Sequence, residues 1–124
     1  MSTNEEIMRR FLALWSTRDA QAMADCFAAD GVYDNVPDKK PMVGPAEIRQ
    51  WLDFCFQHLT RIDVKILNIA SNGEWILSER VDDHIAGDRH MPLPVMNASR
   101  IVDGKITIFR DYYDRKTVTE LGMG

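Results

Sequence analysis

Polar residues spaced two positions apart, in runs typical of β-strands, are the feature of this sequence best suited to chemistry. Arg80 and Asp82 form one such pair, Tyr33 and Asn35 form another, and Asp111 lies between two aromatic residues. Residues i and i+2 of a strand point to the same face about 7 Å apart. Two carboxyl groups in one apolar pocket cannot both ionise at low cost, and an arginine between them can keep one ionised. The set therefore predicts an acid beside a base, which can protonate a leaving oxygen while deprotonating a water.

Each of these pairs also has a purely structural interpretation. Arg80 and Asp82 could form an exposed ion pair, and most such pairs contribute little to stability. Asp111 could lie on the solvent-facing side of its strand, and Asn35 is near a turn, where asparagine is common for local reasons. The functional interpretation requires all five side chains in one pocket, so the elements that carry them become important.

The first helices are indicated by capping residues and apolar spacing. Thr3 followed by Glu6 is a capping box, and apolar residues at spacings of three and four continue over residues 4–17. A second, shorter helix is expected over residues 19–30, because Asp19 can cap it and an Asp-Gly pair can end it.

The rest of the chain is predicted to form one more helix and then strands. Gly44-Pro45 opens a third helix that runs to about His58, because proline suits the first helical position. Before it, residues 32–36 are expected to be extended and residues 38–42 to form an exposed loop. From Arg61 onward the apolar period changes to two, which predicts long strands at 61–71, 74–86, 90–102 and 105–115.

The order of these elements indicates the fold class. Asn72-Gly73 and Asp103-Gly104 favour type I′ hairpin turns, so the four strands should form a meander. Helices followed by a meander predict an α+β domain spanning residues 1–124, with three N-terminal helices packed on a curved, mainly antiparallel sheet. Strands of this length are expected to bend, so that sheet and helices form a cone that encloses a pocket.

Composition excludes several classes of function. The 124 residues include 19 acidic and 15 basic side chains, for a net charge of −4, and no basic run exceeds a pair, which argues against nucleic-acid binding. No apolar stretch approaches the length of a membrane span. Cys26 and Cys55 lie in apolar patterns and are expected to be buried thiols in a reducing compartment, which favours a cytoplasmic location. Without a glycine-rich phosphate loop, a nucleotide cofactor is not expected.

Four segments resemble the limonene-1,2-epoxide hydrolases, a family of the cystatin-like, SnoaL-like superfamily. They are YDNVP at 33–37, SERVD at 78–82, GKIT at 104–107 and FRDYYD at 109–114. Their order and spacing match over nearly the whole chain, from the first helix to about Thr119. The superfamily fold alone indicates little about activity, because it also includes isomerases, cyclases and non-catalytic modules.

The resemblance implies a role for each of the five polar residues. Asp111 would be the general base that takes a proton from water, and Tyr33 and Asn35 would orient that water. Asp82 would be the general acid that protonates the epoxide oxygen, with Arg80 bridging the two carboxyl groups. The implied reaction is one-step hydrolysis of a small or medium apolar epoxide to a vicinal diol, without metal, cofactor or covalent intermediate. Family members are typically homodimers, so a homodimer is expected here.

Some positions depart from the family pattern and leave the substrate open. His84 falls on the face of Arg80 and Asp82, where an apolar wall is expected, and Arg61 stands near the mouth. Pro94 argues for an edge strand or a bulge in its segment. The expected pocket lining is Phe56, Leu59, His84, Leu93, Val95 and Tyr113.

Other functions are compatible with the same residues. Asp82, His84 and His90 could converge on a metal ion only if the turn between them brings the two histidines together. A SnoaL-like polyketide cyclase, an epoxide-opening cyclase or a steroid-type isomerase could use this fold, and the isomerase would not need the bridging arginine. A non-catalytic ligand-binding module predicts that the two carboxylates and the guanidinium lie more than about 10 Å apart, because catalytic contacts require hydrogen-bond reach.

Overall fold

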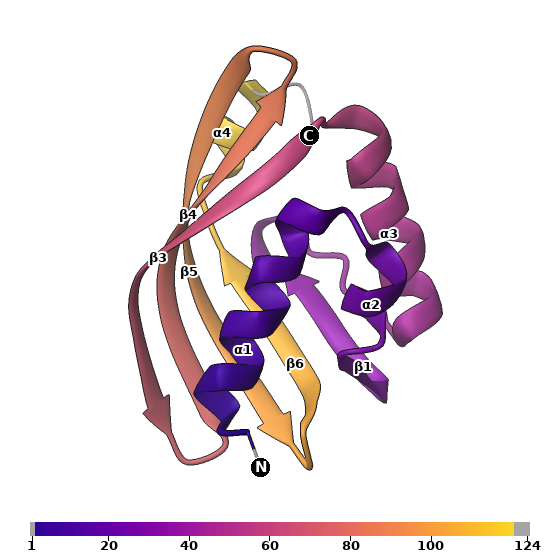
Figure 1. The fold of residues 1–124 in the computed structure, drawn as a ribbon, viewed down its shortest axis with the longest axis vertical. Coiled ribbons are helices and arrows are strands. Elements are labelled where there is room, and N and C mark those ends of the chain that lie inside the picture. Colours follow the sequence, from indigo (N-terminus) through magenta and orange to yellow (C-terminus); the bar gives the residue numbers. More distant parts are fainter. Residues whose placement is uncertain (1, 121–124) are drawn as a thin grey trace.

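A single curved sheet of six strands is the frame of the protein, in a computed structural model that describes residues 2–120 (Figure 1). In chain order the strands are β1 (Phe27–Asn35), β2 (Met42–Val43), β3 (Arg61–Asn72), β4 (Trp75–Ala86), β5 (Arg89–Val102) and β6 (Lys105–Tyr112). Their order across the sheet is β2-β1-β6-β5-β4-β3. All neighbours are antiparallel except β1 and β6, which run parallel.

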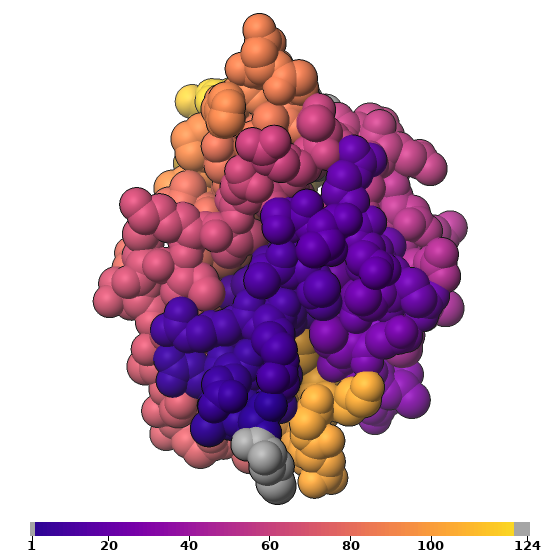
Figure 2. Space-filling view, viewed as in Figure 1, coloured from indigo at the N-terminus to yellow at the C-terminus, as the bar shows by residue number. Residues whose placement is uncertain are grey.

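Of the four α-helices within residues 2–120, the first three begin where the sequence predicts. The four helices are α1 (Asn4–Ala13), α2 (Ala20–Ala24), α3 (Pro45–His58) and α4 (Arg115–Glu120), with short 3-10 turns η1 (Leu14–Thr17) and η2 (Val36–Asp38). The Thr3 side chain accepts a hydrogen bond from the Glu6 backbone N–H at 3.1 Å, and Asp19 accepts one from the Ala22 backbone at 3.0 Å. Figures 1 and 2 show α1 and α2 lying over one face of the sheet, which leaves the opposite face without these helices.

The predicted meander is confirmed, with one difference in turn geometry. Asp103 and Gly104 both have positive φ, as a type I′ turn requires. In the hairpin between β3 and β4, however, Asn72 is the last residue of its strand and the turn is formed by Gly73 and Glu74. Only Gly73 of that turn has a positive φ.

The expectation of a helix over residues 19–30 is wrong in its second half. The helix ends at Ala24, and β1 begins at Phe27. The residue taken as a helix stop, Gly31, lies inside the strand, where the register with β6 shifts. A Cβ on Gly31 would come within 2.8 Å of the Ile106 carbonyl oxygen, so this glycine permits a close backbone approach instead of ending a helix.

The α+β class is confirmed, but three N-terminal helices is not the correct count. A fourth helix, α4, follows the sheet, where the sequence pattern continued the last strand to residue 115. The last strand ends at Tyr112. The segment expected to be an exposed loop contains the first residue of β2, Met42, which pairs with Tyr33.

Pro92 and Pro94 lie in β5 where this strand has a neighbour on one side only. The pairing with β4 extends from Arg89 to Arg100, whereas the pairing with β6 begins at Met96, opposite Tyr112. The first half of β5 is therefore a local sheet edge, in agreement with the expectation of an edge strand at Pro94. No bulge occurs at the prolines; the register shift between β5 and β6 lies near Arg100.

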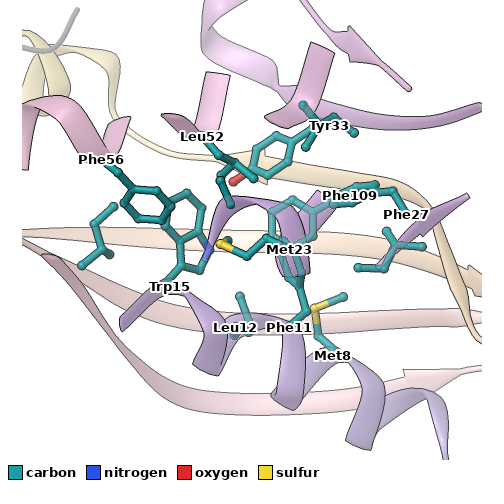
Figure 3. Packing of buried hydrophobic residues seen from close by; sticks show 14 of the residues in the cluster. Met8, Phe11, Leu12, Trp15, Met23, Phe27, Tyr33, Leu52, Phe56 and Phe109 are labelled. Atoms are coloured by element: carbon teal, nitrogen blue, oxygen red, sulfur yellow. The ribbon is translucent and has the colours of Figure 1, made fainter. Parts of the chain in front are cut away.

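An aromatic core joins the helices to the inner face of the sheet (Figure 3). Phe11 of α1 packs edge-on against Phe109 of β6, with ring centroids 5.1 Å apart. Tyr33 of β1 lies against the other side of this cluster, 4.7 Å from the Phe109 centroid and 4.9 Å from that of Trp51 on α3. This packing fixes the ring of Tyr33, one of the predicted site residues.

Candidate active site

The guanidinium of Arg80 lies between two carboxylates. Its Nε and Nη2 donate to the two oxygens of Asp82 at 2.8 and 3.1 Å, and its Nη1 and Nη2 donate to those of Asp111 at 2.9 and 2.7 Å. The Arg80 residue is 1% exposed, Asp82 is 8% exposed and Asp111 is 4% exposed. The fork geometry of arginine allows both contacts to be two-pronged, which a lysine could not reproduce.

Strand alternation and sheet order explain why these three groups meet. In β4, Arg80 and Asp82 belong to the row of buried residues that faces the helices. Asp111 is on the same face of β6, and β5 lies between the two strands. The strands are therefore about 10 Å apart, so that only a long side chain such as arginine can reach from one to the other.

Two effects act in opposite directions on the charges of this triad, Arg80, Asp82 and Asp111. Burial disfavours the charged forms, whereas the ion pairs favour them. Burial raises the pKa of Asp111, and it does so against the Arg80 guanidinium, which lowers it. Burial lowers the pKa of Arg80, but Asp111 and Asp82 outweigh it and raise this pKa well above its usual range. One permanent cation thus compensates two buried carboxyl groups, and a single proton on the pair would make the site neutral.

Tyr33 and Asn35 present free polar groups beside Asp111. In the parallel pairing of β1 with β6, Asn35 stands opposite Asp111 and Tyr33 stands opposite Phe109. Both side chains are buried and line the same pocket as Asp111. Neither the Tyr33 hydroxyl nor the Asn35 amide has a hydrogen-bond partner among residues 2–120. Burial raises the pKa of Tyr33 well above its usual value, so its hydroxyl keeps its proton.

Two further buried residues support Asp111 and were not predicted. The Asn97 side-chain Nδ2 donates to Asp111 Oδ1 at 2.7 Å, and Ser99 Oγ donates to Asn97 Oδ1 at 2.5 Å. Asn97 stands directly opposite Asp111 across β5 and β6. The inward alternation of β5, in which Val95 is followed by Asn97 and Ser99, was the signal that could have identified them.

The pocket beside the triad has a cavity volume of about 90 Å³. Of the residues expected to line it, His84, Leu93, Val95 and Tyr113 do so. Phe56 and Leu59 do not; they pack in the hydrophobic core. The lining also includes residues that were not expected: Trp15, Asp38, Trp51, Phe54, Cys55, Ile62 and Val118.

A short helix and a 3-10 turn contribute to the wall of this pocket. Asp38 of η2 accepts a hydrogen bond from the Tyr113 hydroxyl at 3.1 Å and pairs with Arg115 at the start of α4. Val118 of α4 faces the pocket. The segment after β6 is thus tied to the segment after β1, and the two together bound the site.

The residues of the suggested metal site do not converge. His84 is buried on the inner face, whereas His90 is exposed and its Nδ1 lies 2.7 Å from Asp83 Oδ2. In the part of the chain that the structure describes, no group of three or more His, Cys, Asp and Glu side chains is placed to hold a metal ion. Burial raises the pKa of the pocket-lining Cys55 to about 12, which leaves its thiol protonated and unsuited to nucleophilic attack.

Comparison with known proteins gives one family and several structural relatives. Residues 8–109 match the SnoaL-like domain. Epoxide hydrolase EphG of Mycobacterium tuberculosis is 38% identical over 52 residues, which cover 42% of this chain and 35% of that protein. None of the helices within residues 2–120 has the length and apolar character required to cross a membrane.

Solved structures resemble the chain over nearly its whole length. An LEH-like epoxide hydrolase from M. tuberculosis has a TM-score of 0.81 at 26% identity, covering 94% of this chain and 86% of that one. A protein of ketosteroid isomerase-like fold from Catenulispora acidiphila, crystallised with trimethylamine, has a TM-score of 0.85 at 25% identity, covering 98% and 96%. The resemblance to limonene-1,2-epoxide hydrolases is thereby confirmed.

Proposed function

Because the chain belongs to the SnoaL-like domain family and resembles the limonene-1,2-epoxide hydrolases, we propose that it is an epoxide hydrolase. The substrate is a small epoxide, and water opens its ring in one step to give a vicinal diol. The observation that carries this proposal is the buried Arg80 bridge between Asp82 and Asp111, beside the free polar groups of Tyr33 and Asn35.

The two carboxyl groups have opposite tasks in the proposed reaction. Ionised Asp111 takes a proton from water as the water oxygen attacks one carbon of the oxirane ring. Protonated Asp82 gives its proton to the ring oxygen as the carbon–oxygen bond breaks. The product leaves with both hydroxyl groups, and exchange with solvent returns the proton from Asp111 to Asp82, so the step needs no cofactor.

The free groups beside Asp111 are suited to hold the attacking water. A water that donates one hydrogen to Asp111 and one to the Asn35 amide oxygen, and accepts from the Tyr33 hydroxyl, keeps a lone pair for the epoxide carbon. Fixing the water in this way removes part of the entropic cost of the reaction. The hydrogen bond from Asn97 to Asp111 orients the base toward the same point.

The competing functions fit the geometry less well. A non-catalytic module predicts separated charges, but the atoms of Arg80 lie 2.7–3.1 Å from those of Asp82 and Asp111. A steroid-type isomerase has no use for a fully buried arginine between two acids, and a pocket of small volume favours a small substrate over a steroid. The cavity of about 90 Å³ is well below the roughly 300–1,000 Å³ of pockets that hold drug-sized ligands.

The test is an assay of a panel of epoxides in heavy-oxygen water, with mass detection of the product. Limonene oxide and cyclohexene oxide are suitable first members. We expect a diol that carries one heavy oxygen. Asp82→Asn and Asp111→Asn should each lower kcat by at least about 100-fold, the lower end of what a positioned acid or base contributes.

Each other outcome has a distinct meaning. A ring-opened product without the heavy oxygen would identify a substrate hydroxyl as the nucleophile, and the protein would be an epoxide-opening cyclase. Absence of turnover over the whole panel would contradict the proposal. His90→Leu, a change on the exposed side of the sheet, is the control and should leave the rate unchanged.

A further inference from the structure

His84 is a polar residue in an apolar part of the pocket wall. It follows Arg80 and Asp82 on the inner face of β4 and is 9% exposed. Its cross-strand neighbours are Ile62 of β3 and Met91 of β5, and both are buried apolar side chains. A buried imidazole carries a desolvation cost unless its nitrogens find partners, so the position calls for an explanation.

One ring nitrogen of His84 has a partner within the chain. Its Nδ1 lies 3.0 Å from the backbone carbonyl oxygen of Asp82. A carbonyl oxygen can only accept, so Nδ1 carries the proton and donates it. In the neutral tautomer that this contact selects, Nε2 is the acceptor and its lone pair is unused.

The second nitrogen is open to the pocket. His84 lines the cavity, and its Nε2 has no hydrogen-bond partner among residues 2–120. It is also not among the buried atoms that are sealed from solvent without a partner, as the indole nitrogen of Trp15 is. A fixed acceptor therefore faces the space that the substrate occupies.

We propose that His84 Nε2 accepts a hydrogen bond from a hydroxyl group of the substrate, so that the preferred substrate is a hydroxylated epoxide. This inference rests on the proposed function and names its substrate class. A hydroxyl is the donor that a neutral acceptor in an apolar wall recognises at the lowest desolvation cost. A charged ammonium group would need a carboxylate partner, and the carboxylates that line the pocket are already paired, Asp82 and Asp111 with Arg80 and Asp38 with Arg115.

Strand geometry sets the distance between the epoxide oxygen and the hydroxyl group of the substrate. His84 is two residues beyond Asp82 on the same face, so the two side chains leave the strand about 7 Å apart. The oxirane oxygen must lie at Asp82 to receive its proton. The hydroxyl therefore belongs on the far side of the substrate from the epoxide, as in a cyclohexene oxide with a hydroxymethyl group across the ring.

The experiment compares two substrates that differ only in the hydroxyl. One is cyclohexene oxide with a hydroxymethyl group across the ring, and the other carries an ethyl group at the same carbon. We expect kcat/KM to be about tenfold higher for the alcohol, because an unpaired Nε2 penalises the ethyl compound. His84→Leu should remove this preference, and His84→Gln, which keeps an acceptor, should retain part of it.

Binding provides a second readout that does not depend on turnover. Trp15 and Trp51 line the pocket, so quenching of tryptophan fluorescence can report binding of cyclohexylmethanol and of ethylcyclohexane. We expect tighter binding of the alcohol to the wild-type protein and equal binding of the two by His84→Leu. The exposed His90 offers the matched control, since His90→Leu should preserve both preferences.

The outcomes separate this inference from the proposed function. Equal kcat/KM values for the two epoxides, or a preference that survives His84→Leu, would overturn the role of His84 and leave the epoxide hydrolase intact. Preferential binding of the alcohol without turnover of either epoxide would overturn the hydrolase and support His84 as the hydroxyl acceptor.

Discussion

Asp111, the proposed base, lies in a setting that makes ionisation difficult. Burial raises its pKa, while the contacts from Arg80 and the amide of Asn97 oppose this shift. A raised pKa makes the carboxylate a stronger base, but it also places its protonation closer to neutral pH. The activity should therefore fall on the acidic side at a pH above that usual for an aspartate.

Removal of the side-chain amide of Asn97 should shift this fall in activity, the acidic limb of the pH profile, to still higher pH. In Asn97→Val the ionised form of Asp111 loses a hydrogen bond, so its pKa rises and the limb of kcat/KM against pH shifts to higher pH. At neutral pH the rate should fall several-fold, since hydrogen bonds to charged groups are among the stronger ones. The measurement is a pH profile of wild type, Asn97→Val and Ser99→Ala.

Ser99→Ala serves as the graded control for this prediction. It removes only the contact that orients the Asn97 amide, so its shift should be in the same direction and smaller. An unchanged acidic limb in Asn97→Val would show that Asn97 supports the strand without affecting the base.

For single residues, the alternation in the sequence predicted the positions of some site residues correctly and missed others. It brought Arg80, Asp82 and Asp111 to one face, because a strict period of two is unaffected by what lies across the sheet. It could not reveal that Asn97 contacts Asp111, since that requires the register of β5 with β6. The roles of these residues in catalysis remain predictions.

Among the elements, β1 depends on one glycine. Gly31 lies where β1 approaches the backbone of β6, and a Cβ there would contact the Ile106 carbonyl oxygen at 2.8 Å and the Ala28 carbonyl oxygen at 3.0 Å. Backbone atoms cannot move aside as a flexible side chain can. Tyr33 and Asn35 follow on the same strand, so a displacement of β1 reaches the site.

Gly31→Ala should therefore reduce both stability and activity. We expect a loss of roughly 1–3 kcal/mol in the free energy of unfolding, as for other overpacked sites, measured by denaturant titration. The kcat of the folded fraction should also fall. Gly73→Ala is the control at an exposed turn with open space around the glycine; it should affect stability through its backbone strain but leave kcat unchanged.

Strand β1 also shows which helices and strands could not be predicted from the sequence. The period of two over residues 61–112 is long enough to identify β3 to β6, and the capping residues located α1 and α3. Residues 25–31 have no clear period, and the Asp-Gly pair suggested a helix stop because its real constraint, the neighbouring strand, is distant in sequence. The short helix α4 likewise depends on tertiary contacts such as that of Arg115 with Asp38.

For the whole molecule, the outer face of the sheet is the surface that could join two copies. Met96 and Tyr112 are directly opposite each other on β5 and β6, and they are 52% and 47% exposed. Leu77 of β4 is also exposed on this face, where the half-buried Val81 stands opposite the exposed Pro94. Exposed apolar side chains gathered on one face are typical of an association surface.

We predict a homodimer formed through this outer face. Light scattering after size exclusion should give twice the chain mass of 14.2 kDa. Met96→Glu should shift the protein toward the monomer, because it buries a carboxylate in the interface. Phe54→Glu, at an exposed apolar residue of α3, is the matched control; an unchanged mass in Met96→Glu would contradict this choice of face.

The parallel pairing of β1 with β6 also has a consequence for how activity arises. Arg80 and Asp82 share one hairpin with local contacts, but Tyr33 and Asn35 join Asp111 through strands at opposite ends of the chain. Forming such a non-local pairing has an entropic cost, because it closes a loop over the whole intervening sequence. During synthesis, the half of the candidate site formed by Tyr33, Asn35 and Asp111 cannot exist until β6 has left the ribosome. Assembly of the candidate site therefore coincides with the pairing of β1 with β6.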